Sequence, residues 1–133
     1  MRSLYVDQNG PLAMSDNGIT VLVVEDEVFV RMDIVQFLED EGFKVLEASN
    51  ADDAILLLDA HSEVRLMFTD IDMPGTMDGL KLAAAVRDRW PPVQIIVTSG
   101  HWQMSDSALP VSGRFFSKPY DPSRVIHAIR EMI

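Results

Sequence analysis

The sequence has 133 residues and carries 21 acidic against 11 basic side chains, which gives a formal net charge of -10 at pH 7. This balance argues against a nucleic-acid surface, because phosphate backbones are bound by clustered Lys and Arg, and it favours a cationic partner or a metal ion. The sequence contains no cysteine, which excludes disulfide bonds, thiolate metal ligands and cysteine nucleophiles.

Residues 1–17 have little periodicity and contain the turn-forming runs 9–11 and 15–18. We expect a flexible leader here and a single domain over residues 18–133, since the length and a hydrophobic content of 47% fit one core. No apolar run approaches the roughly 20 residues of a membrane span, and the leader lacks the basic and then apolar order of a secretory signal. We therefore expect a cytoplasmic protein that does not associate with membranes.

From residue 19 onward, short runs rich in Val and Ile alternate with longer segments of helical spacing, which is typical of a parallel α/β sheet. We predict five strands, at residues 19–24, 44–48, 64–69, 93–98 and 114–117. Four helices are predicted at residues 27–41, 51–60, 79–89 and 123–132. Residues that commonly flank helices support these ends, because Gly42 follows the first helix and Asn50, Asp78 and Asp121 precede the others.

Two expectations concern the packing of these elements. The first helix carries apolar residues at helical spacing, and Met32 and Met67 are interpreted as core residues. The spaced residues are Val28, Met32, Val35 and Leu38. Between the last two strands, residues 101–112 are rich in Ser and Asp and contain Pro110, so a helix there is predicted to be short or irregular.

Polar side chains follow the apolar runs of four predicted strands. In a doubly wound sheet of strand order 2-1-3-4-5, the carboxyl ends of these strands meet at one edge, where ligands bind. We therefore expect three carboxylates and a lysine around one small cleft. The strand-end residues are Glu25, Asp26, Asp70, Thr98, Ser99 and Lys118.

Three crowded carboxylates repel one another, and either protonation or a cation must offset that repulsion. Hard oxygen ligands favour Mg²⁺, which keeps several waters and accepts one or two carboxylates together with a substrate phosphate. The expected cleft therefore suits phosphoryl chemistry, with Asp70 as the nucleophile and Lys118 as its positive counterpart.

Each of these residues alone has an ordinary structural interpretation. Residues 25–27 could be a solvated acidic helix start, Asp70 could open a turn, and Lys118 could be surface charge. Thr98 with Ser99 could be a strand-end hydroxyl pair, and only the coincidence at four strand ends favours a site.

The three histidines lack metal-binding spacing and are interpreted as solvated, although the loop of one would flank the cleft. They are His61, His127 and the flanking His101.

Five motifs occur in order along the chain, and by these motifs it resembles a response-regulator receiver domain of two-component signalling over residues 19–133. The resemblance implies a flavodoxin-like (βα)5 sandwich. It also implies a signalling phosphoacceptor rather than an enzyme, because such a domain catalyses only its own phosphorylation and slow autodephosphorylation. The motifs are Val23-Val24-Glu25-Asp26-Glu27, Thr69-Asp70-Ile71-Asp72-Met73-Pro74-Gly75, Asp78-Gly79, Val97-Thr98-Ser99-Gly100 and Phe116-Ser117-Lys118-Pro119-Tyr120.

The resemblance also implies partners and roles. Asp70 accepts a phosphoryl group from a sensor histidine kinase or a histidine phosphotransfer protein. Mg²⁺, which Mn²⁺ could replace, is held by Glu25, Asp26, Asp70 and the backbone carbonyl of Asp72. The phosphoryl group is bound by Thr98, Ser99 and Lys118. The loops are shaped by Met73, Pro74 and Pro119.

The output implied by the resemblance is a change of surface. Phe115 turns inward when Thr98 moves towards the phosphoryl group, and the switch rests on packing because phenylalanine lacks a tyrosine's hydroxyl. The surface that changes comprises residues 101–112, the strand 114–117 and the helix 123–132. Its target is an unidentified protein, and a homodimer through the same surface stays open.

Three versions of this interpretation remain open: a stand-alone switch, a phosphate sink, and a receiver segment of a hybrid kinase. A different class is a small phosphohydrolase of the haloacid-dehalogenase type, whose paired aspartates resemble Asp70 and Asp72. That family has Thr or Val where Pro74 stands and usually needs a longer chain, so it is disfavoured.

The turn 74–79 carries one residue more than the commonest receiver pattern, which should change only the loop beside the site.

Overall fold

Five parallel strands form one sheet in the order β2-β1-β3-β4-β5 in the computed structural model, which describes residues 18–75, 77–101 and 113–133. The strands are β1 (Thr20–Val24), β2 (Lys44–Ala48), β3 (Val64–Asp70), β4 (Gln94–Ser99) and β5 (Arg114–Ser117). The helices of the described residues are α1 (Val28–Asp40), α2 (Ala51–Ala60), α3 (Gly79–Arg89) and α4 (Pro122–Met132). The predicted flavodoxin-like α/β fold and its strand order are confirmed.

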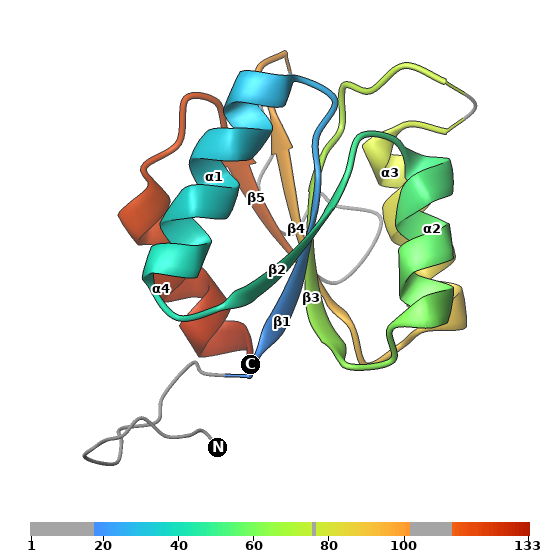
Figure 1. The fold of residues 1–133 in the computed structure, drawn as a ribbon. Coiled ribbons are helices and arrows are strands. Elements are labelled where there is room, and N and C mark those ends of the chain that lie inside the picture. Colours follow the sequence, from blue (N-terminus) through green and yellow to red (C-terminus); the bar gives the residue numbers. More distant parts are fainter. Residues whose placement is uncertain (1–17, 76, 102–112) are drawn as a thin grey trace.

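The helices cover both faces of the sheet, with α1 and α4 on one side and α2 and α3 on the other (Figure 1). Strand β1 illustrates why, because its successive side chains alternate between the two faces. Val21 and Val23 belong to the core cluster beneath α1 and α4, whereas Leu22 and Val24 belong to the cluster beneath α2 and α3. All four are fully buried, as expected for a parallel strand covered on both sides.

The predicted helix-end signals are confirmed. The side chain of Asn50 accepts a hydrogen bond from the backbone N–H of Asp53, and Asp78 and Asp121 cap α3 and α4 in the same way. Gly42 follows α1 with φ of 97°, a left-handed conformation that glycine adopts without steric cost. The predicted helix within residues 101–112 lies mostly outside the described residues, as does the leader.

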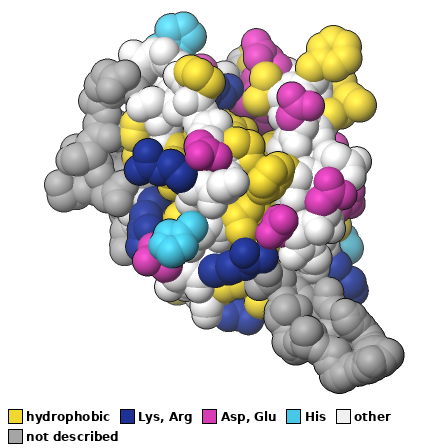
Figure 2. Space-filling view, turned by 90° about the vertical axis from the view of Figure 1, so that its left-hand side faces the viewer, with side chains coloured by type: hydrophobic (Ala, Val, Ile, Leu, Met, Phe, Trp, Pro, Cys, Tyr) yellow, Lys and Arg dark blue, Asp and Glu magenta, His cyan; other side chains and the backbone are white. Residues whose placement is uncertain are grey.

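The apolar face predicted for α1 is partly wrong. Val28 and Met32 are 52% and 54% exposed, so Met32 is not a core residue, whereas Met67 is fully buried as predicted. The buried residues of α1 are Ile34, Val35 and Leu38. At 3.6 residues per turn, Met32 lies about 120° from Leu38 around the helix axis, which turns it away from the sheet. Hydrophobic side chains accordingly reach the surface on the α1 and α4 side of the molecule (Figure 2).

No helix of the described residues is both long and apolar enough to cross a membrane.

Gly79 allows the start of α3 to pack against the end of β3. Its N–H donates to the carbonyl of Ile71 at 3.1 Å. A Cβ at this position would overlap the carbonyl oxygen of Asp70 and lie 2.8 Å from the Cα of Ile71. Because these are backbone atoms, no side-chain rotation relieves the overlap. The absence of a side chain at Gly79 therefore helps to fix the backbone that carries Asp70.

We expect Gly79→Ala to lower the free energy of unfolding by about 3 kcal/mol, although alanine is the better helix former, because the added methyl group overlaps backbone. Urea unfolding measures this change. Gly100→Ala is the control, since among the described residues a Cβ there meets only the Cβ of Lys118 at 3.9 Å. This substitution should alter stability by less than about 1 kcal/mol. Equal effects of the two substitutions would contradict the packing account.

Candidate functional site

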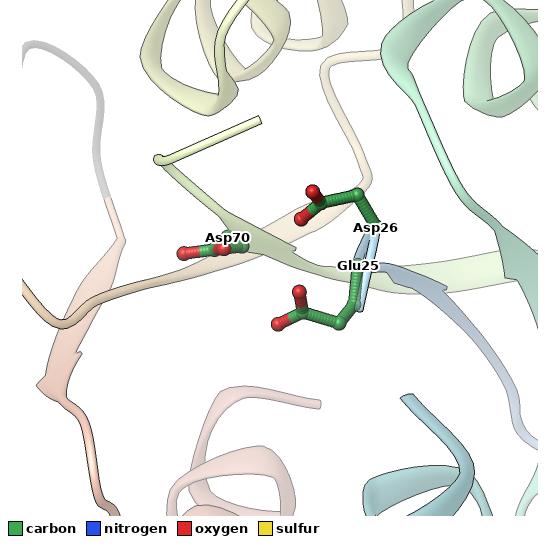
Figure 3. Close-up of side chains that lie close together, drawn as sticks. All are labelled: Glu25, Asp26 and Asp70. Atoms are coloured by element: carbon green, nitrogen blue, oxygen red, sulfur yellow. The ribbon is translucent and has the colours of Figure 1, made fainter. Parts of the chain in front are cut away.

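Three carboxylates meet at the carboxyl edge of the sheet. Strand β1 runs parallel to β3 with Val24 opposite Thr69, so the residues that follow them, Glu25 with Asp26 and Asp70, emerge side by side. Figure 3 shows these three side chains together at the strand ends, and each offers an oxygen within 4.8 Å of the others. The convergence predicted for these carboxylates is therefore present in the structure.

The cluster lies in a poorly hydrated position. Glu25 and Asp70 are 2% and 3% exposed, and Asp26 is half-buried. Burial raises the pKa of Glu25 and the pKa of Asp70, because it removes water from their charged forms. The two carboxylates also repel each other, which further raises the pKa of Glu25. The site therefore needs positive charge.

Lys118 supplies one positive charge. Its N–H donates to the carbonyl of Ser99 at 2.9 Å, so it extends the pairing of β5 with β4 and points its side chain at the cluster. Its Nζ lies 2.9 Å from Oε1 of Glu25 and 3.1 Å from Oδ2 of Asp70. Burial acts to lower the pKa of Lys118, but the hydrogen bonds to both carboxylates outweigh it and raise that pKa above its usual range. One ammonium still faces three carboxylates.

Two buried oxygens at the site lack partners. Among the described residues, Oδ1 of Asp70 and Oγ1 of Thr98 have no hydrogen-bond partner. These residues lie opposite each other in the pairing of β3 with β4. Buried polar atoms without partners are rare in folded proteins and often belong to a ligand site. Together with the surplus negative charge, the free carboxylate oxygen fits a cation, so the acidic cluster could hold a metal ion.

A second polar group lies beside this cluster. The hydroxyl of Ser99 donates to Oδ2 of Asp72 at 2.7 Å, and Nδ1 of His101 lies 3.2 Å from the same oxygen. Partial burial opposes ionisation of Asp72, but the hydrogen bonds from Ser99 and His101 lower its pKa. The sequence places His101 beside the cleft, but it does not predict this contact. The metal-binding role of the Asp72 carbonyl stays a prediction.

The remaining predicted site residues surround the cluster. Phe115 and Met73 are half-buried and pack against the core cluster beneath α2 and α3. Pro74 is exposed and lines a cavity of about 630 Å³ together with Asp26. Pro119 lines a cavity of about 370 Å³ together with Lys118, and the peptide between them is cis.

Sequence reasoning missed two residues near the site. Tyr120 packs edge-on against Phe68, with ring centroids 5.5 Å apart. Burial, and to a smaller extent the negative charge of Glu25, raises the pKa of Tyr120 to about 12. Arg31 donates from Nη1 to the backbone carbonyl of Glu25 at 2.8 Å. The apolar spacing of α1 does not reveal Arg31; the available signal is a basic residue in the first turn of the helix that follows the acidic strand end.

Comparisons with known proteins agree with this geometry. The family model for the response regulator receiver domain matches residues 21–130. The hydrogenase transcriptional regulatory protein HoxA of Cupriavidus necator is 36% identical over 124 residues, which are 90% of this chain and 25% of HoxA. The sensor kinase CckA of Brucella abortus is 32% identical over 118 residues, which are 86% of this chain and 12% of CckA. The chain thus spans a quarter or less of these relatives.

A solved structure is similar along nearly its whole length. The response regulator receiver protein from Sinorhizobium medicae superimposes with a TM-score of 0.78 and is 27% identical. The match covers 86% of this chain and 93% of that protein.

Replacing Lys118 with methionine should destabilise the protein at pH 7.5, because two buried carboxylates lose the cation that contacts both. The expected loss is about 1–3 kcal/mol, reduced by the 22% exposure of the lysine side chain. A carboxyl with a raised folded-state pKa favours the folded state at low pH and loses this contribution as the pH rises through that pKa. The deficit should therefore shrink when urea unfolding is repeated at pH 5.

Lys81→Met is the matched control, since Lys81 is exposed on α3 and its loss should change stability by less than about 0.5 kcal/mol. A Lys118→Met deficit that is no larger than the control, or that is the same at both pH values, would refute the proposed charge balance.

Proposed function

The chain belongs to the response regulator receiver domain family, and from this premise we propose that it is a phosphorylation-dependent protein switch with Asp70 as the phosphoryl acceptor. Members of this family are signalling phosphoacceptors rather than catalytic enzymes. One observation carries the assignment to Asp70. Its Oδ1 is buried and lacks a partner among the described residues, whereas its Oδ2 is held by Lys118.

The proposed reaction is an in-line transfer from a phosphohistidine. Oδ1 of Asp70 attacks the phosphorus atom, an O–P bond forms, and the P–N bond to the donor imidazole breaks with its electron pair going to the nitrogen. Lys118 neutralises charge on the acceptor, and the Thr98 hydroxyl donates to a phosphoryl oxygen. The hydroxyl of Ser99 lies at the same strand end and becomes a further phosphoryl contact when it exchanges its hydrogen bond to Asp72 for one to a phosphoryl oxygen.

Mg²⁺ is the cofactor that fits the donor set, and Mn²⁺ could replace it. Glu25, Asp26 and Asp70 would hold it with the backbone carbonyl of Asp72, on the support of their clustered oxygens. When bound, the ion supplies positive charge against the phosphoryl oxygens.

The proposed output runs through Thr98 and Phe115. Thr98 moves towards the phosphoryl group, and the half-buried ring of Phe115 follows into the vacated space. Thr98 is opposite Phe116, the chain neighbour of Phe115, in the pairing of β4 with β5, so Thr98 and Phe115 lie on adjacent strands. The surface that changes comprises β5 and α4, and the prediction extends it to residues 101–112, most of which lie outside the described residues. Met73, Pro74 and Pro119 shape the loops beside the site.

The protein is proposed to act in the cytoplasm. Its proposed partners are a sensor histidine kinase or histidine phosphotransfer protein as donor and a protein target as receiver of the signal. The net charge of -10 disfavours nucleic acid as the target. A phosphate sink and a receiver segment within a longer kinase are the alternatives of the same class. The division into a leader of residues 1–17 and a domain of residues 18–133 stays a prediction.

Incubation with acetyl phosphate and Mg²⁺ should add one phosphoryl group, seen as an increase in intact mass of about 80 Da. Asp70→Asn should remove the adduct, and omission of Mg²⁺ should slow its formation strongly, because the acceptor oxygen is then surrounded by unbalanced negative charge. Asp72→Asn is the matched control, since it changes a neighbouring carboxylate that is not the acceptor, and it should still be labelled. Equal labelling of Asp70→Asn would overturn the assignment, and steady turnover of phosphoesters without an adduct would favour the phosphohydrolase.

Thr98→Val should leave labelling of Asp70 intact but weaken the response of β5, since valine keeps the shape of threonine without its hydroxyl. The measurement is the change in backbone amide NMR shifts of Phe115 and Phe116 on phosphorylation. Thr20→Val is the control, because Thr20 is also buried in a strand but lies at the opposite end of the sheet. Shifts as large in Thr98→Val as in the wild type would exclude Thr98 from the switch.

A further inference from the structure

Glu25 and Asp26 are adjacent in the chain, yet both carboxylates face the same cluster (Figure 3). In an extended strand, successive side chains point to opposite faces of the sheet. The backbone must therefore leave the strand conformation between them. It does so directly after β1, where Asp26 and Glu27 form a bend before α1 begins at Val28. The orientation of the Glu25–Asp26 peptide thus decides whether both side chains reach the site.

This peptide is held from the side by Arg31. The N–H of Glu25 still pairs with the carbonyl of Ala48 in β2, at 3.0 Å. The carbonyl of Glu25 lies beyond the end of β1 and accepts instead from Nη1 of Arg31 at 2.8 Å. The Nε of the same guanidinium lies 3.2 Å from Oε1 of Glu47 on β2. The arginine side chain is 18% exposed, so its planar fork is well packed between α1 and the strand ends.

Resting on the proposed function, we propose that Arg31 is a positioning residue for the metal-binding carboxylates. The carbonyl of Glu25 and the Cα of Asp26 belong to one rigid peptide plane. Fixing that carbonyl therefore fixes the N–Cα bond of Asp26, from which its side chain leaves the backbone. Arg31 thereby sets the affinity of the site for Mg²⁺, without contacting either the metal-binding oxygens or the phosphoryl group.

A purely structural ion pair between α1 and β2 makes a different prediction. Glu47 is 48% exposed, and a pair with so much solvent contributes little to stability. Arg31 has two opposing effects on the affinity for Mg²⁺. Its positive charge repels Mg²⁺ and weakens binding, whereas its hydrogen bond to the Glu25 carbonyl positions the ligands and strengthens binding. Removal of the charge alone should strengthen metal binding, whereas loss of the positioned peptide should weaken it. The sign of the change separates the two effects.

The test is calorimetric titration of MgCl₂ into the full chain, with thermal unfolding as a check that each variant is folded. Arg31→Lys keeps the charge but not the fork, and Arg31→Gln removes the charge. Arg31→Lys should bind Mg²⁺ about 10-fold more weakly, in the range found when a group that orients a metal ligand is lost. Arg31→Gln should also bind more weakly, but by a smaller factor, because it no longer carries the charge that repels Mg²⁺. Glu47→Gln should bind within about twofold of the wild type, because the exposed pair contributes little.

Unchanged affinity in Arg31→Lys, or tighter binding in Arg31→Gln, would overturn the inference, as would a 10-fold loss in Glu47→Gln. Arg31→Lys keeps most of the buried aliphatic part of the side chain. Its Mg²⁺ affinity therefore tests the inference if Arg31→Gln does not fold. Asp26→Asn separates this inference from the proposed function. Wild-type affinity in Asp26→Asn would refute the metal site itself, whereas weak binding there with normal binding in Arg31→Lys would refute only the role of Arg31.

Discussion

Electrostatic repulsion among three carboxylates at one sheet edge is the constraint on which the rest of the structure depends. The repulsion is strong because Glu25 and Asp70 are buried and little water screens them. The parallel pairing of β1 with β3 brings these groups together, and the pairing of β4 with β5 brings Lys118 to meet them. Because one lysine does not balance three acids, the site is suited to gain a cation.

The same constraint links the site to the remainder of the fold. The backbone that carries these mutually repelling carboxylates must be held in place. Contacts from two helices hold it. Gly79 lets α3 approach the backbone of Asp70, and Arg31 on α1 holds the carbonyl of Glu25. Thr98 lies opposite Asp70 in the sheet, so a change of charge at the acceptor is one strand away from the residue proposed to transmit it.

The sequence predicted the strands and the three carboxylates, because these rest on a local pattern of apolar runs and strand-end polar residues. The strand order followed from the doubly wound fold class that the alternation of strands and helices indicates. The sequence could not predict features that depend on rotation about a helix axis or on backbone contacts. Met32 fits the apolar spacing of α1 but is turned away from the sheet. The contact of Asp72 with Ser99 joins the loop after β3 to the end of β4, 27 residues away along the chain. The close approach of Gly79 to Asp70 appears only once α3 is docked.

The central claim is that the phosphoryl group is carried by Asp70. Borohydride reduction of the phosphorylated protein tests it most directly, because an acyl phosphate is reduced to an alcohol and an aspartate in that state becomes homoserine. Peptide mapping should then find homoserine at position 70 only, and only after incubation with the phosphoryl donor. Homoserine at another carboxylate, such as Asp26 or Asp72, or at none, would contradict the account.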